Sequence, residues 1–518
     1  MLMAFRKILI LILPFLFAGC AQIGQISGGD QDIIAPCPLA DKTFPPSKST
    51  FFKGNSFEMN FDEFVQLNNP QQTLFIVPNH AVLKPSIHKK TLKVEWDDTL
   101  MANTTYVIYM NGTIKDVSES NDSLLTYVFS TGESVDSLQY SVQVIDAWAN
   151  RMIKDATVGL YLESDSVKPY YFAKTTESGL ANFQYLKAGK YKVKAFIDSN
   201  KDLEIQPKEA IAFRSDFIII DSTIVDSIPL RISQPKAPKA ITTYKFIAPG
   251  SFVVGTNFSQ KEAAYFINSQ QIDSSKIRQI EDDSVQLFMS LKDISIAELI
   301  LKSTDFTDTI SLRLTEKEKI AKLNFSPTFN SQIVRPNDVI SFLLNDVISA
   351  VDTTKISITD PADSSIVPYK IKYVLNQFYL TLDRGTHKQL LLTLLKGAVK
   401  STGDISDSSS FLMTLKTEKD FGVIHLEAEE FSGQIIVELL QGNNVMNTVI
   451  LAAEKKHSFT YLQPGDYSFR VILDQNKNGV WDTGNLKLGS QPENVLWFSS
   501  PTKVRANWEV DVSLTPKL

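Results

Sequence analysis

Short runs of alternating apolar and polar residues constrain this chain more than any other feature. The segments 57–61 and 92–96 alternate strictly, and 106–109 does so less strictly. Successive side chains of a strand point to opposite faces, so such runs at intervals of about ten residues are typical of antiparallel sandwiches. The best candidates for helical spacing, 260–266 and 315–321, are both short. The sequence therefore predicts an all-β chain of tandem antiparallel β-sandwiches.

An internal duplication divides the chain. The segment 185–201 recurs at 461–477, with each matched residue 276 positions later. Beyond it, Gln206-Pro207-Lys208-Glu209 is matched by Gln491-Pro492-Glu493 at an offset of 285, so the second copy has nine additional loop residues. Weaker echoes relate 61–65 to 344–348 and 112–115 to 397–400, for which chance similarity is the alternative. A two-domain unit is therefore expected to occur twice.

Composition excludes several classes of protein. A length of 518 residues exceeds what one core can fill and favours about three to five domains. The net charge of −6 argues against the basic surface that nucleic acid requires. The two cysteines, Cys20 and Cys37, do not suffice for a disulfide framework. We expect Cys37 to be an incidental linker residue rather than a reactive thiol.

The N-terminus has the features of an export signal. Arg6 and Lys7 precede the apolar run 8–17, which is too short to span a membrane. The following Ala18-Gly19-Cys20 resembles the lipobox of bacterial lipoproteins. The resemblance implies cleavage after residue 19, covalent lipid on Cys20 and membrane attachment through that lipid. An ordinary secretory signal with a chance cysteine is the alternative.

The position after Cys20 bears on the destination of the protein. No acidic residue occurs in 21–25, where an aspartate commonly signals inner-membrane retention. We therefore expect lipid anchoring in the outer membrane, with the periplasmic face and the cell surface both open.

Two further resemblances concern the body of the chain. The runs Asn60-Phe61-Asp62-Glu63-Phe64-Val65 and Asn103-Thr104-Thr105-Tyr106 resemble the bacterial immunoglobulin-like domain of surface-layer proteins and Bacteroidetes lipoproteins. The segment 186–193, repeated at 462–469, resembles prealbumin-like, carboxypeptidase-regulatory-like sandwiches. Families of these kinds are spacers and interaction modules, and a sandwich hosts many functions.

These resemblances and the duplication imply a domain order. It comprises a signal peptide (1–19), the lipidated Cys20 with a linker (20–46), an immunoglobulin-like domain (47–133), a prealbumin-like sandwich (134–235), a β-rich domain (236–319), a second immunoglobulin-like domain (320–419) and a second prealbumin-like sandwich (420–518). We expect these domains to lie end to end.

Both copies of an acidic loop carry oxygen side chains at a spacing that suits calcium, which takes six to eight oxygen ligands. The candidate metal ligands are Asp198, Asn200, Asp202 and Glu209 in the first loop and Asp474, Asn476, Asn478 and Asp482 in the second. The first loop has Leu203 where a sharp turn favours glycine, and the second has Gly479 there. Asx-rich turns without metal are the alternative.

Catalysis has little support in the sequence. The histidines (His80, His88, His387, His425 and His457) are scattered, and no nucleophile elbow or phosphate-binding loop occurs. The tryptophans (Trp96, Trp148, Trp481, Trp497 and Trp508) suit a sugar-stacking platform, but strand spacing is more typical of core or interface residues.

We therefore expect a non-enzymatic, outer-membrane-anchored lipoprotein that acts as a scaffold or accessory interaction subunit of a cell-envelope complex. Its partners would be envelope proteins and the membrane, not nucleic acid. A surface adhesin or glycan-binding lipoprotein is the alternative.

Replacing Cys20 by serine (Cys20→Ser) tests the anchor. The variant should lose lipidation and lipoprotein processing, because serine lacks the thiol that forms the thioether. We expect it to leave the outer-membrane fraction, which fractionation and mass spectrometry of the mature N-terminus measure. Normal maturation and outer-membrane fractionation of Cys20→Ser would contradict the lipoprotein interpretation.

Overall fold

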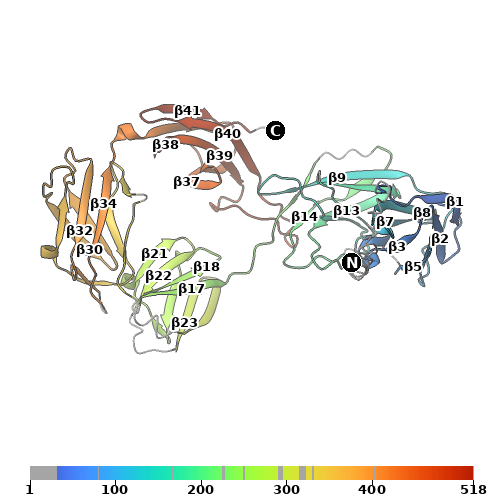
Figure 1. The fold of residues 1–518 in the computed structure, drawn as a ribbon, viewed down its shortest axis with the longest axis horizontal. Helices are drawn as coiled ribbons and strands as arrows, with labels where there is room; N and C mark the ends of the chain where they lie inside the picture. The colour runs from blue at the N-terminus through green and yellow to red at the C-terminus, as the bar shows by residue number, and fades with distance from the viewer. Residues whose placement is uncertain are drawn as a thin grey trace, which may run out of the picture.

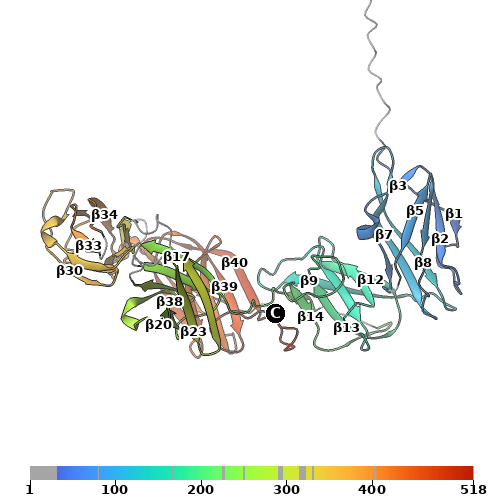
Figure 2. The ribbon, with the colours of Figure 1, turned by 90° about the horizontal axis from the view of Figure 1, so that it is seen from below.

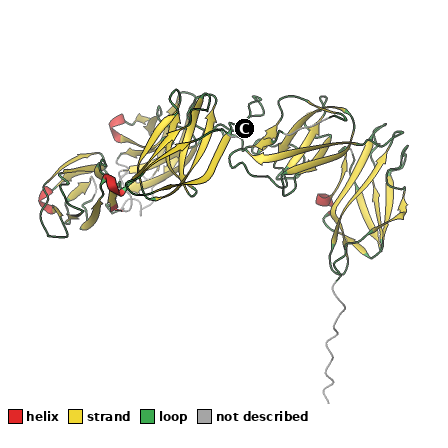
Figure 3. Cartoon of the chain, turned by 90° about the horizontal axis from the view of Figure 1, so that it is seen from above, coloured by secondary structure: helices red, strands yellow, loops and turns green. Residues whose placement is uncertain are grey.

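The computed structural model describes residues 32–79, 81–165, 167–223, 228–248, 251–289, 296–313, 322–329, 332–401 and 404–516. The predicted signal peptide, Cys20, His80 and the predicted helix 315–321 lie outside them. Strands dominate the described residues, with a few short helical turns (Figure 3). Among these described residues, the sheets fall into five consecutive groups of strands, and no sheet joins strands of two groups (Figure 1). The predicted fold class is confirmed.

The first sandwich contains strands β1–β8. One sheet has the order β1-β2-β6-β5, and in the other β3, β4 and β8 pair with β7. Its elements are β1 Pro38–Phe44, β2 Ser56–Phe61, β3 Val65–Leu67, α2 Pro70–Thr73, β4 Leu74–Val77, β5 Lys84–His88, β6 Thr91–Glu95, β7 Thr105–Asp116 and β8 Asp122–Ser130. Phe57 and Tyr127 stack in the core with ring centroids 3.9 Å apart. The alternation of β2 and β6 thus places large apolar side chains between the sheets.

Strand β1 occupies part of the segment predicted as linker. Leu39 pairs with Asn60 of β2, and the N–H of Cys37 donates to Asp62 Oδ1 at 2.9 Å. Thr43 is the buried residue of this strand. Backbone hydrogen bonds, rather than an apolar face, hold this edge strand, so alternation does not reveal it. The linker prediction is wrong for Pro38–Phe44.

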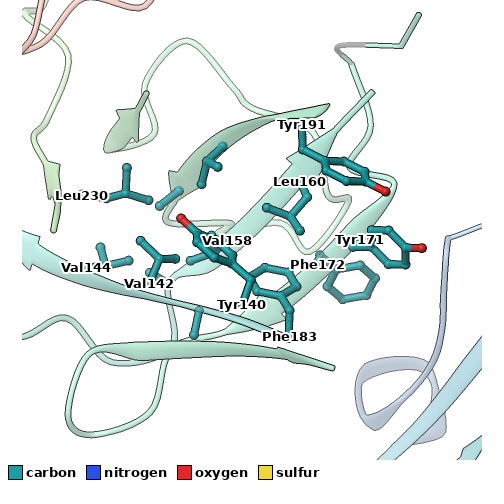
Figure 4. Close-up of a cluster of buried hydrophobic side chains, with 14 of the residues drawn as sticks. Tyr140, Val142, Val144, Val158, Leu160, Tyr171, Phe172, Phe183, Tyr191 and Leu230 are labelled. Atoms are coloured by element: carbon teal, nitrogen blue, oxygen red, sulfur yellow. The ribbon is translucent and has the colours of Figure 1, made fainter. Parts of the chain in front are cut away.

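The second sandwich contains β9–β16. Its sheets are β12-β9-β16 and β11-β10-β13-β14, with β15 also paired to β13. The strands are β9 Leu138–Asp146, β10 Thr157–Tyr161, β11 Tyr171–Lys174, β12 Leu180–Leu186, β13 Gly189–Phe196, β14 Ile211–Phe213, β15 Ile218–Ile220 and β16 Leu230–Ile232. Figure 4 shows Val142 and Val144 of β9 near Val158 of β10 in the core.

The third sandwich packs sheet β17-β18-β22-β21 on sheet β20-β19-β23-β24. Its elements are β17 Ile241–Ala248, β18 Ser251–Thr256, β19 Ala264–Ile267, β20 Gln270–Gln271, η2 Ser274–Lys276, β21 Ile277–Glu281, β22 Ser284–Phe288, β23 Ile296–Ser303 and β24 Phe306–Arg313. Strand β19 contradicts the predicted helix 260–266. Tyr265 and Ile267 alternate into the core, and this period of two prevails over the helical spacing.

The fourth sandwich has sheets β25-β27-β31-β30, β26-β34-β32-β29 and β28-β33. Its elements are β25 Phe325–Pro327, β26 Ile333–Val334, β27 Ile340–Leu344, β28 Ile348–Val351, η5 Thr353–Lys355, β29 Ile356–Thr359, β30 Tyr369–Val374, β31 Gln377–Leu382, β32 Gln389–Leu394, β33 Val399–Ser401 and β34 Ser409–Leu415. Phe342 and Phe378 stack at 5.1 Å in its core.

The fifth sandwich packs sheet β38-β35-β41 on sheet β37-β36-β39-β40. Its elements, after η6 Glu418–Asp420, are β35 Gly422–Glu427, β36 Gln434–Gln441, β37 Asn444–Leu451, β38 Lys456–Leu462, β39 Gly465–Asp474, β40 Val495–Val504 and β41 Glu509–Ser513. Tyr467 Oη donates to Gln463 O at 2.8 Å, and Tyr191 Oη donates to Lys187 O at 2.9 Å in the second sandwich. The same tyrosine hydrogen bond thus occurs in both sandwiches, which supports the duplication.

Within the described residues, no helix is long and apolar enough to cross a membrane.

The first and second sandwiches share a packed boundary. Phe75 lies 4.9 Å from Phe172 between ring centroids, and Val77 joins the core of the second sandwich. The N–H of Asn79 donates to Tyr170 O at 3.2 Å. Apolar burial and backbone bonding therefore set the angle between these two sandwiches.

The third sandwich contacts the fourth, and the fourth contacts the fifth. Ser251 Oγ donates to Asn345 O at 2.5 Å, and Asn376 Nδ2 approaches Gln286 Oε1 at 3.3 Å in a buried position. At the next boundary, Asn337 Nδ2 donates to Tyr461 Oη at 2.7 Å in an exposed position. Polar groups buried between sandwiches restrain their orientation when they are hydrogen-bonded.

The fifth sandwich returns to the second. Figure 1 shows it between the fourth sandwich and the second, and Figure 2 shows the first and fourth sandwiches at opposite ends of the molecule. The N–H of Gly484 donates to Ser233 Oγ at 2.9 Å, which joins residues of the two duplicated sandwiches. The chain is therefore not the open, end-to-end row that we expected.

Candidate functional site

The two acidic loops share a hydrogen-bonded frame. Glu209 accepts hydrogen bonds from the N–H groups of Ser199 and Gln206, at 2.8 and 3.0 Å. Glu493, its counterpart, accepts from two N–H groups of the second loop, at 2.8 and 3.1 Å. Both glutamates are buried. Each carboxylate therefore holds separate parts of its loop together through backbone hydrogen bonds. The same hydrogen bonds stabilise the buried negative charge.

In the second loop, the residues predicted as ligands lie together. The Nδ2 atoms of Asn476 and Asn478 both donate to Asp482 Oδ2 at 2.5 Å. Asp474 is buried and accepts from the N–H groups of Asn478 and Gly479, at 3.1 and 2.8 Å. Gly479 has φ +80°, a conformation that side-chain-bearing residues rarely adopt.

The first loop brings its predicted ligands together less closely. Asn200 Nδ2 donates to Asp202 Oδ2 at 2.7 Å, whereas Glu209 faces the backbone frame instead. Burial raises the pKa of Asp198, and the N–H groups of Leu203 and Lys201 oppose that shift. Leu203, at the position where a glycine is usual, adopts the left-handed conformation with φ 62°.

The second loop is the better fit to a hard cation. Rotating the carboxamides of Asn476 and Asn478 would turn their oxygens toward Asp482, because the two ends of a carboxamide have the same shape. Across the described ranges, however, no three His, Cys, Asp or Glu side chains are arranged to hold a metal ion. Calcium binding by either loop stays a prediction.

The second loop lies beside a joint that the sequence did not predict. Trp148 of the second sandwich and Trp481 of the second loop pack against Ile436, Ile472 and Val495. These three buried apolar residues lie on the outer face of sheet β37-β36-β39-β40, away from the core of the fifth sandwich. The two indoles lie 4.8 Å apart between ring centroids. The joint is therefore a small apolar cluster shared by two sandwiches.

Trp148 is held in place by the turn that follows β9. Asp146 Oδ1 accepts from the N–H groups of Trp148 and Ala149, at 2.9 and 2.6 Å. The N–H of Ala147 donates to Ile232 O at 2.8 Å, which ties the turn to β16. The indole is thus presented from a fixed turn rather than from a free loop.

Arg470 completes the joint. Its guanidinium carbon lies 4.1 Å from the Trp148 ring and 4.8 Å from the Trp497 ring. Its Nε and one terminal nitrogen bond to Glu438, and both side chains are largely buried. Trp497 Nε1 donates to the carbonyl oxygen of Trp148 at 2.8 Å. Tryptophan and arginine in a desolvated patch are the residue types that carry most of the energy of protein interfaces.

Further contacts of the second loop and its flanking residues strengthen the joint. Gly484 approaches Ser233 so closely that an added Cβ would lie 3.3 Å from Ser233 Oγ and 3.1 Å from Pro492. Gln491 Nε2 donates to Phe213 O at 3.0 Å. Lys236, in the connection to the third sandwich, lies 3.6 Å from Asp482. The duplication offset was the sequence signal that could have indicated this contact.

A cavity of about 690 Å³ lies between the loops. Ile205, Pro207 and Ile211 line it from the second sandwich, and Leu486 and Gln491 line it from the fifth. Sites for small molecules and peptides commonly occur at such domain boundaries.

The tryptophans do not form a common platform. Trp96 is buried in the first core, while Trp148, Trp481 and Trp497 contribute to the joint. Trp508 is half exposed and stacks with Arg505 at 4.6 Å.

One serine–histidine–carboxylate chain occurs on the fifth sandwich. His425 lies 2.9 Å from Ser458 Oγ through Nδ1 and 3.0 Å from Glu509 Oε2 through Nε2. The side chains occupy the outer face of sheet β38-β35-β41, where His425 and Glu509 are exposed. The N–H groups of the central strand pair with both neighbouring strands, whereas nucleophilic catalysis needs free donors for the oxyanion and a site that excludes water. We interpret the arrangement as a surface hydrogen-bond network.

Calcium should raise the melting temperature of the chain if the second loop binds it, because a ligand specific to the folded state stabilises that state. Asp482→Asn should abolish the shift, since it removes a ligand charge with little change of shape. Glu454→Gln, at an exposed site outside the loops, is the matched control. Melting curves that calcium and chelator leave unchanged would reduce the loops to ordinary turns.

Trp148→Ala should open the joint. The substitution removes the ring that covers Ile436 and Ile472, at a cost of about 2–4 kcal/mol for an interface tryptophan. We expect a larger radius of gyration in small-angle X-ray scattering, with circular dichroism unchanged. Trp508→Ala should scatter like the unmodified chain. An unaltered scattering curve for Trp148→Ala would show that the joint does not depend on this indole.

A family model matches the first sandwich of the chain. Residues 36–131 match the bacterial Ig-like domain family, a match that includes β1. No curated protein matches the chain.

Several solved structures match the chain at about 10% sequence identity. The Bacillus anthracis TIE protein is 10% identical over 95% of this chain and 76% of its own, with a TM-score of 0.16. Domains 1–6 of the surface layer protein SbsC are 10% identical over 90% of this chain and 67% of their own, with a TM-score of 0.15. SGBP-B of the Bacteroides ovatus mixed-linkage glucan utilization locus, solved with a heptasaccharide, is 10% identical over 72% and 91%, with a TM-score of 0.19. By the family match, residues 36–131 are similar to bacterial Ig-like domains.

Proposed function

We propose that the chain is a non-enzymatic lipoprotein, anchored in the outer membrane through Cys20, that serves as a scaffold or accessory interaction subunit of a cell-envelope complex. The observation that carries this proposal is the joint between the second and fifth sandwiches. A chain of freely linked sandwiches could adopt many shapes, whereas this contact restrains the sandwiches that it connects. A scaffold requires such fixed faces.

The remaining boundaries support the same function. The first and second sandwiches pack through Phe75 and Phe172, and buried hydrogen bonds join the third and fourth. The second and third sandwiches are linked by a segment that contains Pro235 and Pro238. Proline restricts the conformations that such a linker can adopt. The body therefore presents its exposed strands and loops at defined positions.

The alternative of an adhesin or glycan-binding lipoprotein has less support. Sugar recognition by stacking needs exposed aromatic faces, and Trp148, Trp481 and Trp497 are committed to the joint. Trp508 alone among the five tryptophans is half exposed without a role in the core or the joint.

Affinity capture of the full-length chain from detergent-extracted outer membranes tests the proposal. We expect envelope proteins to co-purify at a fixed stoichiometry and to be lost from Cys20→Ser, which does not reach the membrane. A chain that purifies alone, and that is retained on immobilised polysaccharide, would contradict the scaffold and favour the alternative.

A further inference from the structure

The cavity between the acidic loops belongs to neither duplicated sandwich alone. One wall carries Ile205 and Ile211 of the second sandwich, and the opposite wall carries Leu486 of the fifth. Its volume of about 690 Å³ lies within the range of about 300–1,000 Å³ that is typical of ligand sites. The cavity exists only while the joint is closed, because its two walls come from the two sides of the joint.

The residues that distinguish the second copy build this cavity. Its additional loop folds back on itself through a bridge between Asn485 and Ser490. Asn485 Oδ1 accepts from the N–H groups of Lys487 and Leu488, at 3.0 and 3.2 Å. Leu488 at the tip remains 78% exposed. The additional loop therefore supplies an exposed aliphatic side chain beside the cavity.

The lining combines aliphatic and carboxamide side chains. Gln206, Gln475 and Asn485 accompany the aliphatic residues, and no aromatic ring is among the lining residues of the described chain. Gln206 Nε2 donates to Asp202 and Asn485 Oδ1 accepts within its loop, but the Gln206 oxygen, the Asn485 nitrogen and the Gln475 carboxamide match the N–H and C=O of a peptide group. Aliphatic walls fit aliphatic side chains, whereas sugar sites rely on aromatic stacking.

Apart from Lys487, which is exposed to water, the charged groups of the lining are engaged with the protein itself. Glu209 and Glu493 receive backbone N–H groups, and Lys236 lies 3.6 Å from Asp482. A charged ligand would lose hydration in the cavity without gaining a free counter-charge from these groups. The electrostatics therefore favour an uncharged occupant.

We propose that this cavity binds an extended, uncharged segment of a partner polypeptide, with one aliphatic side chain inserted between Ile205 and Leu486. The inference rests on the proposed interaction function and deepens it by naming the surface and the kind of partner. Because both sandwiches contribute walls, the bound peptide stabilises the closed joint, and opening the joint weakens peptide binding.

The test uses the full-length chain and a phage-displayed library of random dodecapeptides as the probe. We expect selection of uncharged sequences that contain an aliphatic residue, followed by measurable binding of the synthetic peptides in fluorescence anisotropy. Ile205→Asp and Leu486→Asp should each weaken binding at least tenfold. Trp148→Ala should weaken it as well, although Trp148 is not among the lining residues, and Trp508→Ala should leave it unchanged.

Three results would overturn the proposal. The first is no enrichment above the starting library, and the second is peptide binding that Ile205→Asp and Leu486→Asp leave intact. The third is displacement of the selected peptides by neutral oligosaccharides, which would assign the cavity to glycan. If Ile205→Asp still co-purifies with the envelope partners of the unmodified chain, those partners dock elsewhere, and the scaffold function stands without this site.

Discussion

Trp148 packs on Ile436, Ile472 and Val495, and this contact joins two sandwiches that are far apart in the sequence. Its ring also faces Arg470, whose charge is balanced by Glu438. Removing one member of a buried ion pair costs about 3–5 kcal/mol, so the apolar and ionic parts of the joint stabilise each other. The cavity and the close approach of Gly484 to Ser233 lie at the same boundary between the two sandwiches.

The duplicated sandwiches use equivalent positions differently. Arg470 lies 276 positions after Lys194, which stacks on Tyr161 of its own sandwich at 4.3 Å. In the second sandwich that face is therefore covered from within, whereas the fifth sandwich receives Trp148 from outside. The contact joins unlike surfaces of the two duplicated sandwiches. Between separate copies of a subunit, a contact of unlike surfaces produces either a closed ring or an open filament. Here both surfaces are on one chain, and the joint closes within it.

Much of the fold was accessible from the sequence because burial repeats locally. The alternation in 57–61 and 92–96 corresponds to strands β2 and β6, and the constant offset of the duplication corresponds to matched tyrosine hydrogen bonds. Strand β1 escaped prediction because its hydrogen bonds, rather than an apolar face, hold it in place. The acidic loops were located correctly as loops, but their buried glutamates bond to backbone N–H groups, a role that spacing alone does not show.

The sequence by itself determined the all-β class, the repeated unit and the position of the acidic loops, since each follows from residues that are neighbours in the chain. The joint and its cavity were decided by tertiary structure. The sequence around Trp148 does not distinguish it from a tryptophan of a sandwich core. Only the packing of two distant sandwiches places Ile436 and Arg470 beside it. Contacts between residues so far apart leave no periodicity in the sequence, because the intervening sandwiches, not the local backbone, set the distance between them.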